Sequence, residues 1–172
     1  EAQSAVDYLK EQGVVSGITA TTYGPELSIR RGDFALMLVR AFKLTAGGGT
    51  GQRFSDVPAT AYYADAVQTL RALGIVSGTG GNLYQPTSTL SRQDAMLMVQ
   101  RAMRISGYSA GDGPSYVLSS YSDSGSVSSY AQGAMAYVVQ QGLLPTTGNR
   151  LAPRDALSRV DMAVLLHRAM TM

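Results

Sequence analysis

The 172-residue sequence predicts an all-α fold built from three tandem helix-loop-helix repeats. A five-residue motif with arginine in the middle and aspartate at the end occurs three times, at 29–33, 90–94 and 157–161. An apolar run with helical spacing follows each copy, and the motif arginines are 61 and then 67 residues apart. Repeats of this length bury their apolar faces against one another, so function is expected at recurring positions or between repeats.

The second repeat shows the elements of the unit most completely. Apolar residues at helical spacing in 66–73 predict a first helix, and Gly74 is placed to end it in the left-handed conformation. The loop 77–86 is rich in glycine and polar residues, and it predicts a tight turn. Ser91 and Asp94 form a capping box before the next apolar stripe, so a second helix is expected to begin there.

The first and third repeats follow the same order with fewer of these features. Ser158 and Asp161 repeat the capping box, whereas Arg30 replaces the serine in the first copy. Because each copy is too small to bury a core alone, we expect one composite domain. Its parts are the first repeat at 1–46, which lacks an N-terminal opening segment, the second at 53–105 and the third at 120–172.

Composition argues against several classes of function. The chain is 45% hydrophobic and 15% charged, as in globular proteins, and its net charge of +2 is too small for a surface that tracks nucleic acid. No apolar run reaches the roughly 18 residues that span a membrane, so no membrane insertion is expected. Cysteine is absent and His167 is the only histidine, so the sequence indicates no metal site, no cofactor and no enzyme.

The basic residues are mostly arginine. Only two of the 14 are lysines, at positions 10 and 43. Arginine binds carboxylate or phosphate through two parallel hydrogen bonds, so the bias favours recognition of a specific anion. A GC-rich genome explains the bias equally well when it is considered alone.

Four motifs of the second repeat resemble those of the S-layer homology repeat, in that family's order. Residues 54–58 match the opening Phe-x-Asp-Val-Pro segment, Tyr62 stands where the family usually has tryptophan, and 74–78 match the Gly-Ile-Val-x-Gly turn. Residues 91–94 match the Thr-Arg-Ala-Glu-type motif. The other repeats match in part, at 13–17, 30–33, 121–123, Tyr130, 142–144 and 158–161.

The resemblance implies a pseudo-threefold arrangement of the three repeats around a shared helical core. It also implies grooves between repeats that bind an acidic secondary cell-wall polysaccharide, often through a pyruvate ketal on an N-acetylated mannosamine. Such a module anchors its protein non-covalently to the bacterial cell wall or S-layer, outside the cell. S-layer and other cell-surface proteins are its expected neighbours.

The resemblance also assigns ligand-binding residues by position. The motif arginines are expected to contact the acidic sugar, while the opening aspartates, the aromatic residues and the turn glycines shape the groove and the capping serines position the arginine. An arginine at a helix N-terminus would add its donors to free backbone N–H groups, where a carboxylate binds well. The expected ligand-binding residues are Arg31, Arg92, Arg159, Asp56, Asp123, Tyr62, Tyr130, Gly17, Gly78, Ser91 and Ser158.

Simpler roles compete with ligand binding at several positions. Capping alone explains the spacing of the two serines, and it is the preferred interpretation for them. The motif arginines are alternatively partners of ion pairs with the neighbouring repeat. Three further arginines, Arg40, Arg101 and Arg168, lie near expected helix C-termini, where compensation of the helix dipole is a sufficient role.

Two classes of function therefore stay open. The alternative to wall anchoring is a protein-interaction or self-assembly scaffold with arginine ion pairs at repeat or subunit seams. Recurrence of the loop glycines together with the arginine favours the sugar groove. We expect the groove of the second repeat, with Asp56, Tyr62 and Arg92, to be the most complete, and that of the first repeat, with Arg31, to be the weakest.

Overall fold

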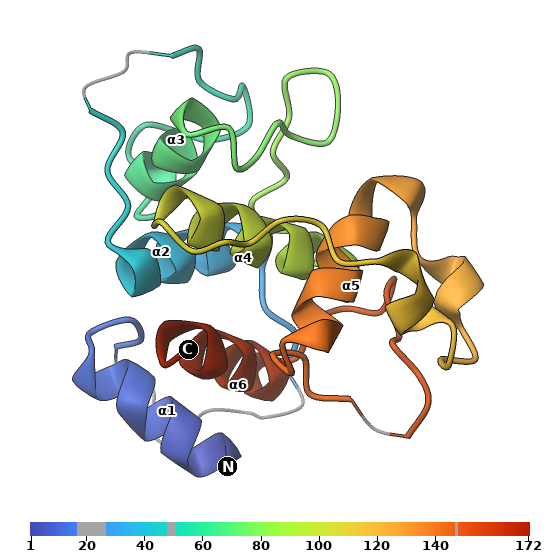
Figure 1. Cartoon of the computed structure of the whole chain (residues 1–172). Coiled ribbons are helices and arrows are strands. Elements are labelled where there is room, and N and C mark those ends of the chain that lie inside the picture. Colours follow the sequence, from blue (N-terminus) through green and yellow to red (C-terminus); the bar gives the residue numbers. More distant parts are fainter. Residues whose placement is uncertain (17–26, 48–50, 147) are drawn as a thin grey trace.

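The computed structural model describes residues 1–16, 27–47, 51–146 and 148–172 (Figure 1). Within these ranges there are six α-helices and no β-strand beyond isolated bridges, so the predicted all-α fold is confirmed. The α-helices are α1 (Ala2–Glu11), α2 (Arg31–Phe42), α3 (Ala64–Ala72), α4 (Arg92–Ile105), α5 (Gln132–Gln140) and α6 (Arg159–Met170), and three short 3-10 helices, η1 (Ser115–Leu118), η2 (Ser124–Ser126) and η3 (Ser129–Ala131), precede α5.

The helices pair between repeats rather than within them. The first helix of the second repeat, α3, packs mainly against α2 of the first repeat, and α5 of the third repeat packs against α4 of the second. The circle closes because α1 packs along α6, the last helix of the chain (Figure 1). Each repeat therefore contributes its two helices to two different pairs.

A closed ring of backbone hydrogen bonds joins the three arginine motifs. The N–H of Ile29 donates to the carbonyl of Leu157 at 3.0 Å, that of Leu157 to Leu90 at 2.8 Å, and that of Leu90 to Ile29 at 3.1 Å. All three side chains are buried. The ring relates the motifs cyclically, while the pseudo-threefold arrangement of the whole repeats stays a prediction.

The hydrophobic core is shared among the repeats. Buried apolar side chains form one cluster that includes Leu9, Leu38, Leu70, Met96 and Leu165. Because isolated helices of about 12 residues or fewer are marginal in water, these helices depend on this shared packing. None of the described helices has the length and apolar character needed to cross a bilayer.

Two second helices begin at the caps that the sequence predicts. The hydroxyl of Ser91 accepts the N–H of Asp94 at 3.3 Å, and the hydroxyl of Ser158 accepts that of Asp161 at 3.1 Å. The capping interpretation of the serines is confirmed. The helix α2 begins after Arg30 without a side-chain cap, as expected from the arginine at that position.

Candidate functional site

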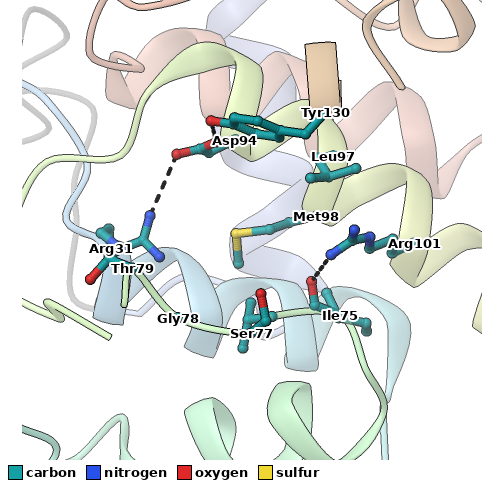
Figure 2. A pocket seen from close by; sticks show the side chains of 11 residues that line it. Arg31, Ile75, Ser77, Gly78, Thr79, Asp94, Leu97, Met98, Arg101 and Tyr130 are labelled. Atoms are coloured by element: carbon teal, nitrogen blue, oxygen red, sulfur yellow. Dashed lines mark hydrogen bonds and ion pairs between the residues drawn. The ribbon is translucent and has the colours of Figure 1, made fainter. Parts of the chain in front are cut away.

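An open groove of about 450 Å³ lies beside Arg31, at a place where residues of all three repeats come together (Figure 2). We call it the Arg31 groove. Figure 2 shows Arg31 and Arg101 at opposite ends of the groove with Met98 between them. The lining comprises Arg31 from the first repeat, 75–79, Asp94, Leu97, Met98 and Arg101 from the second, and Tyr130 from the third.

A second groove, of about 320 Å³, is lined by residues at the equivalent positions, each taken from the preceding repeat in the cyclic order. We call it the Arg159 groove. Its arginine comes from the third repeat, its turn and helix from the first, and its tyrosine from the second. Gly17, the turn glycine expected here, lies outside the described residues. The described lining is Val14, Val15, Ser16, Asp33, Leu36, Met37, Arg40, Tyr62 and Arg159.

The third interface between repeats, which we call the Arg92 seam, contains no matching open groove among the described residues, because the chain itself fills the space beside Arg92. The Arg92 guanidinium donates to the carbonyl oxygens of Leu151 at 2.9 Å and Pro145 at 3.1 Å, and to the Asp161 carboxylate at 2.5 Å. A pocket of about 390 Å³ does lie beside Arg92. It is lined from the 150–161 segment and not from the turn that contains Pro145, so it is not a counterpart of the two grooves.

Arg31 joins two repeats while it lines its groove. Its side chain is largely buried, and its Nε donates to the carbonyl oxygen of Tyr84 at 2.8 Å. Its Nη1 lies 3.7 Å from the Asp94 carboxylate, and its guanidinium carbon lies 4.7 Å from the centre of the Tyr84 ring. Together with the Arg92–Asp161 pair, this contact shows the ion pairs between repeats that the sequence left open as an alternative.

The opening aspartate of the second repeat braces the same seam. Asp56 accepts the backbone N–H of Tyr84 at 2.9 Å and that of Gln85 at 2.7 Å. The carbonyl of Tyr84 is the acceptor for Arg31, so Asp56 holds that acceptor in place. Asp56 is not among the residues that line the Arg31 groove.

The opening aspartate of the third repeat makes the equivalent contacts. Asp123 accepts the backbone N–H groups of Leu151 and Ala152, both at 2.8 Å, and Leu151 is the acceptor for Arg92. Burial alone would raise the pKa of Asp123, but these two N–H donors and Arg150 lower it below its ordinary value. The two aspartates therefore act on the loop backbone beneath the motif arginines.

Two exposed tyrosines form the rims of the grooves. The hydroxyl of Tyr130 donates to Asp94 at 2.6 Å, and that of Tyr62 donates to Asp33. The hydrogen bond to Asp33 raises the pKa of Tyr62 to about 12, and burial together with the bond to Asp94 raises the pKa of Tyr130. Both phenols are neutral at pH 7, and each can offer a flat face and a hydroxyl to a ligand.

Gly78 has a packing role that explains its place in the turn. Its φ is +91°, and a Cβ built there would lie 2.5 Å from the carbonyl oxygen of Leu83 and 2.6 Å from the ring of Phe54. Only glycine fits such a position. The first helix and the turn of the third repeat follow those of the second by 68 residues, as Gly142 follows Gly74, so Pro145, whose carbonyl contacts Arg92, stands at the position of Ser77.

The backbone N–H groups at the helix starts are already paired, which corrects the expectation that a ligand would use them. Those of Arg31 and Gly32 donate to the carbonyls of Ser88 and Pro86, at 2.9 and 2.8 Å. The first two N–H groups of α4 donate in the same way to the 153–155 segment. The helix starts therefore join neighbouring repeats, and these N–H groups are not available to a ligand.

The structure distributes the residues of one repeat over all three seams. The sequence grouped Asp56, Tyr62 and Arg92 in one groove, whereas Asp56 braces Arg31, Tyr62 lines the Arg159 groove, and Arg92 lies in the closed seam. Arg31 was expected in the weakest groove and lines the larger of the two open ones. The expected grouping of these residues was therefore wrong, while the expected difference in affinity between the grooves stays a prediction.

Two groove residues were missed as binding residues by the sequence reasoning. Arg101 lines the Arg31 groove and donates from Nη1 to the carbonyl of Ile75 at 3.0 Å, and Arg40 lines the Arg159 groove. The helix α4 continues to Ile105, so Arg101 lies before its last turn and dipole compensation does not describe its role. The signal was present, because these arginines recur with the same 61- and 67-residue steps as the motif arginines.

Comparison with known proteins points to one family. A family model for the S-layer homology domain matches three tandem parts of the chain, at residues 1–35, 53–96 and 120–163. These matches begin where the three predicted repeats begin.

Several relatives align with nearly the whole chain. Exoglucanase XynX of Acetivibrio thermocellus is 24% identical over 168 residues, which are 96% of this chain and 15% of the relative. The surface-layer 125 kDa protein of Lysinibacillus sphaericus is 28% identical over 171 residues, 97% of this chain and 14% of the relative. S-layer protein EA1 of Bacillus anthracis is 20% identical over 162 residues, 94% of this chain and 18% of the relative. The chain thus spans less than a fifth of each of these proteins.

Proposed function

The chain belongs to the S-layer homology domain family, and we propose that it binds an acidic secondary cell-wall polysaccharide in the Arg31 groove and the Arg159 groove. Membership in the family gives it a cell-surface or cell-wall location and an anchoring role, which it shares with its surface-layer relatives. The finer identity of the ligand and its place on the chain are what the proposal adds.

The observation that carries the proposal is the pair of arginines in the Arg31 groove. Arg31 and Arg101 lie at its two ends, the exposed ring of Tyr130 forms a rim, and the apolar Met98 lies between the arginines (Figure 2). Arginine favours carboxylate, and an aromatic face favours the apolar face of a sugar ring. The combination fits a sugar that carries a carboxylate, such as the pyruvate ketal implied by the resemblance.

The turn of the second repeat supplies further donors. The backbone N–H groups of Ser77 and Gly78 have no acceptor among the described residues, and both residues line the groove. Unpaired backbone donors at a surface need water or ligand oxygens as partners. They match the hydroxyl, acetamido and carboxylate oxygens of such a sugar.

We propose that the chain has no catalytic activity of its own. Its relatives include exoglucanase XynX and an amylopullulanase of Thermoanaerobacterium thermosulfurigenes, but the chain covers only 15% and 9% of them. Within the described ranges no group of three His, Cys, Asp or Glu residues is arranged to hold a metal. The enzymatic names therefore describe proteins in which such a segment is a small part.

Binding to purified cell-wall sacculi tests the proposal. The chain should sediment with sacculi that retain the secondary polymer and stay in solution after acid extraction of that polymer. The Tyr130→Ala variant should bind less, while Tyr116→Ala, which changes a 72% exposed tyrosine outside the lining of both grooves, should bind as the unchanged chain does. Equal binding before and after extraction would contradict the proposal.

A self-assembly scaffold remains the second candidate because surface-layer proteins are among the relatives. The ion pairs that this alternative expected occur inside the chain, between Arg31 and Asp94 and between Arg92 and Asp161. They consequently join repeats and are not available to a second copy. Analytical ultracentrifugation should show a monomer; concentration-dependent association without glycan would favour the scaffold.

A further inference from the structure

In the Arg92 seam, a carboxylate of the chain itself occupies the place that corresponds to a groove. Arg168 donates from Nη1 to the carbonyl of Gly142 at 2.9 Å, and from Nε and Nη2 to one carboxylate oxygen of Glu1, at 2.8 and 2.5 Å. Glu1 stands at the repeat position that Tyr62 and Tyr130 hold in the two open grooves. The Arg168 guanidinium is thus held by a carbonyl along one edge and by a carboxylate along the other.

Arg101 repeats half of this arrangement in the Arg31 groove. Its Nη1 donates to the carbonyl of Ile75 at 3.0 Å; Gly142 is the counterpart of Gly74, the residue before Ile75, so the two acceptor carbonyls lie one residue apart in equivalent turns. Its Nε and Nη2 have no acceptor among the described residues. These are the two atoms that bind Glu1 in Arg168, and Figure 2 shows the Arg101 guanidinium within the groove, beside Met98.

Arg31, at the other end of the groove, is less suited to a ligand carboxylate. Its Nε already donates to the carbonyl of Tyr84, and the Asp94 carboxylate lies 3.7 Å from its Nη1. A second carboxylate at this guanidinium would be repelled by Asp94. The charge of Arg31 is thus largely balanced, while Arg101 has a carbonyl as its only described partner.

We propose that Arg101 is the carboxylate-binding residue of the Arg31 groove, and that Glu1 imitates the ligand carboxylate in the Arg92 seam. The assignment rests on the proposed function and deepens it, because it moves recognition of the acid group from Arg31, the motif arginine of the first repeat, to Arg101 on α4 of the second repeat. Arg40, which lines the Arg159 groove, is the counterpart of Arg101 by position.

The Glu1–Arg168 pair also shows that this position binds a carboxylate despite water around it. Glu1 is exposed, yet the hydrogen bond from Arg168 lowers its pKa below the ordinary value. A two-point arrangement around one oxygen accounts for this preference for the ionised form. An acidic sugar in the Arg31 groove would find the same two donors, Nε and Nη2, on Arg101, and the Tyr130 ring at the rim would shield this contact from water.

Titration calorimetry with two sugars tests the inference. The probes are a pyruvylated N-acetylmannosamine monosaccharide and the same sugar without the ketal. For Arg101→Gln, affinity for the acidic sugar in the Arg31 groove should fall roughly 10-fold to 150-fold, while affinity for the neutral sugar changes little. Arg53→Gln, at an exposed arginine outside the groove, is the matched control and should keep the preference for the acid.

The outcomes separate the inference from the proposed function. If the unchanged chain binds neither sugar, the proposed function fails. If it prefers the acidic sugar and Arg101→Gln keeps that preference, the inference is overturned. Should Arg101→Gln lose its native circular dichroism, Arg101→Lys replaces it as the variant. Lysine keeps the positive charge and the aliphatic part of the side chain, but it cannot form the two parallel hydrogen bonds of a guanidinium. An unreduced acidic preference in that variant would also overturn the assignment.

Discussion

Arg31 and Tyr84 join the first two repeats by a reciprocal pair of hydrogen bonds. The Nε of Arg31 donates to the carbonyl of Tyr84 at 2.8 Å, and the hydroxyl of Tyr84 donates to the carbonyl of Arg31 at 3.0 Å. Tyr84 is fully buried, and its burial raises the pKa of its hydroxyl far above the ordinary value. The residue that the family motif marks for ligand binding is therefore also a structural tie between repeats.

Tyr84→Phe should lower the free energy of unfolding by about 0.5 to 1.5 kcal/mol, because the buried hydrogen bond from its hydroxyl to the carbonyl of Arg31 would be lost. Urea denaturation measures the change. The control is Tyr116→Phe, which removes a hydroxyl from a tyrosine that is 72% exposed and should have no effect within error. Equal stability of both variants would mean that the reciprocal pair contributes nothing.

Arg92→Ala should destabilise the chain by about 2 to 3 kcal/mol. The side chain is largely buried and donates to Leu151, Pro145 and Asp161, so its removal leaves three acceptors without this partner. Thermal or urea unfolding checks the value against Arg53→Ala, at an exposed arginine. The change should leave sugar affinity unaltered, because Arg92 lines neither open groove. A stable variant with weakened binding would reverse this assignment.

Asp123→Asn should remove a part of the stability that depends on pH. The pKa of Asp123 is lowered in the folded chain, so its carboxylate stabilises the fold above the ordinary aspartate pKa and loses this effect as pH falls through the lowered value. The difference in unfolding free energy between the unchanged chain and Asp123→Asn should thus be greatest near neutral pH and shrink in acid. A difference that grows on acidification would contradict this account.

The three repeats should unfold in one cooperative transition. Helices pair between repeats, α1 closes onto α6, and the ring through Ile29, Leu90 and Leu157 joins all three motifs. The second repeat expressed alone, 53–105, would lack the partners of both its helices and should show little helical circular dichroism and no cooperative melting. A monomeric 53–105 segment that melts cooperatively would show that the repeats fold independently.

Local features of the fold were predictable from the sequence because they depend on neighbouring residues. Gly74 follows α3 with a φ of +73°, as predicted for a helix end, and Ser91 and Ser158 cap α4 and α6. Helical spacing identified the apolar faces. Helical spacing does not show which other helix an apolar face packs against. The packing of α3 on α2 of the preceding repeat could therefore not be predicted from it.

The candidate site was predictable in its residue types and not in its groupings. Arg31, Arg159, Tyr62, Tyr130 and Gly78 line open grooves, as expected. Residues of one repeat, however, lie in different interfaces between repeats. Because the helices pair between repeats, the motif arginine of each repeat lies beside the turn of the next repeat. The filled Arg92 seam depends on long-range contacts of Pro145 and Glu1, which sequence spacing alone does not encode.

Titration calorimetry of the unchanged chain with a pyruvylated N-acetylmannosamine monosaccharide tests the central claim most directly. The Arg31 and Arg159 grooves are open, with about 450 and 320 Å³, while Pro145 and Glu1 occupy the Arg92 seam. The account predicts binding at about two sites of unequal affinity. The Arg31 groove should have the higher affinity, because a hydrogen bond to the carbonyl of Ile75 already fixes the Arg101 guanidinium in place. Three equivalent sites, or no binding at all, would contradict it.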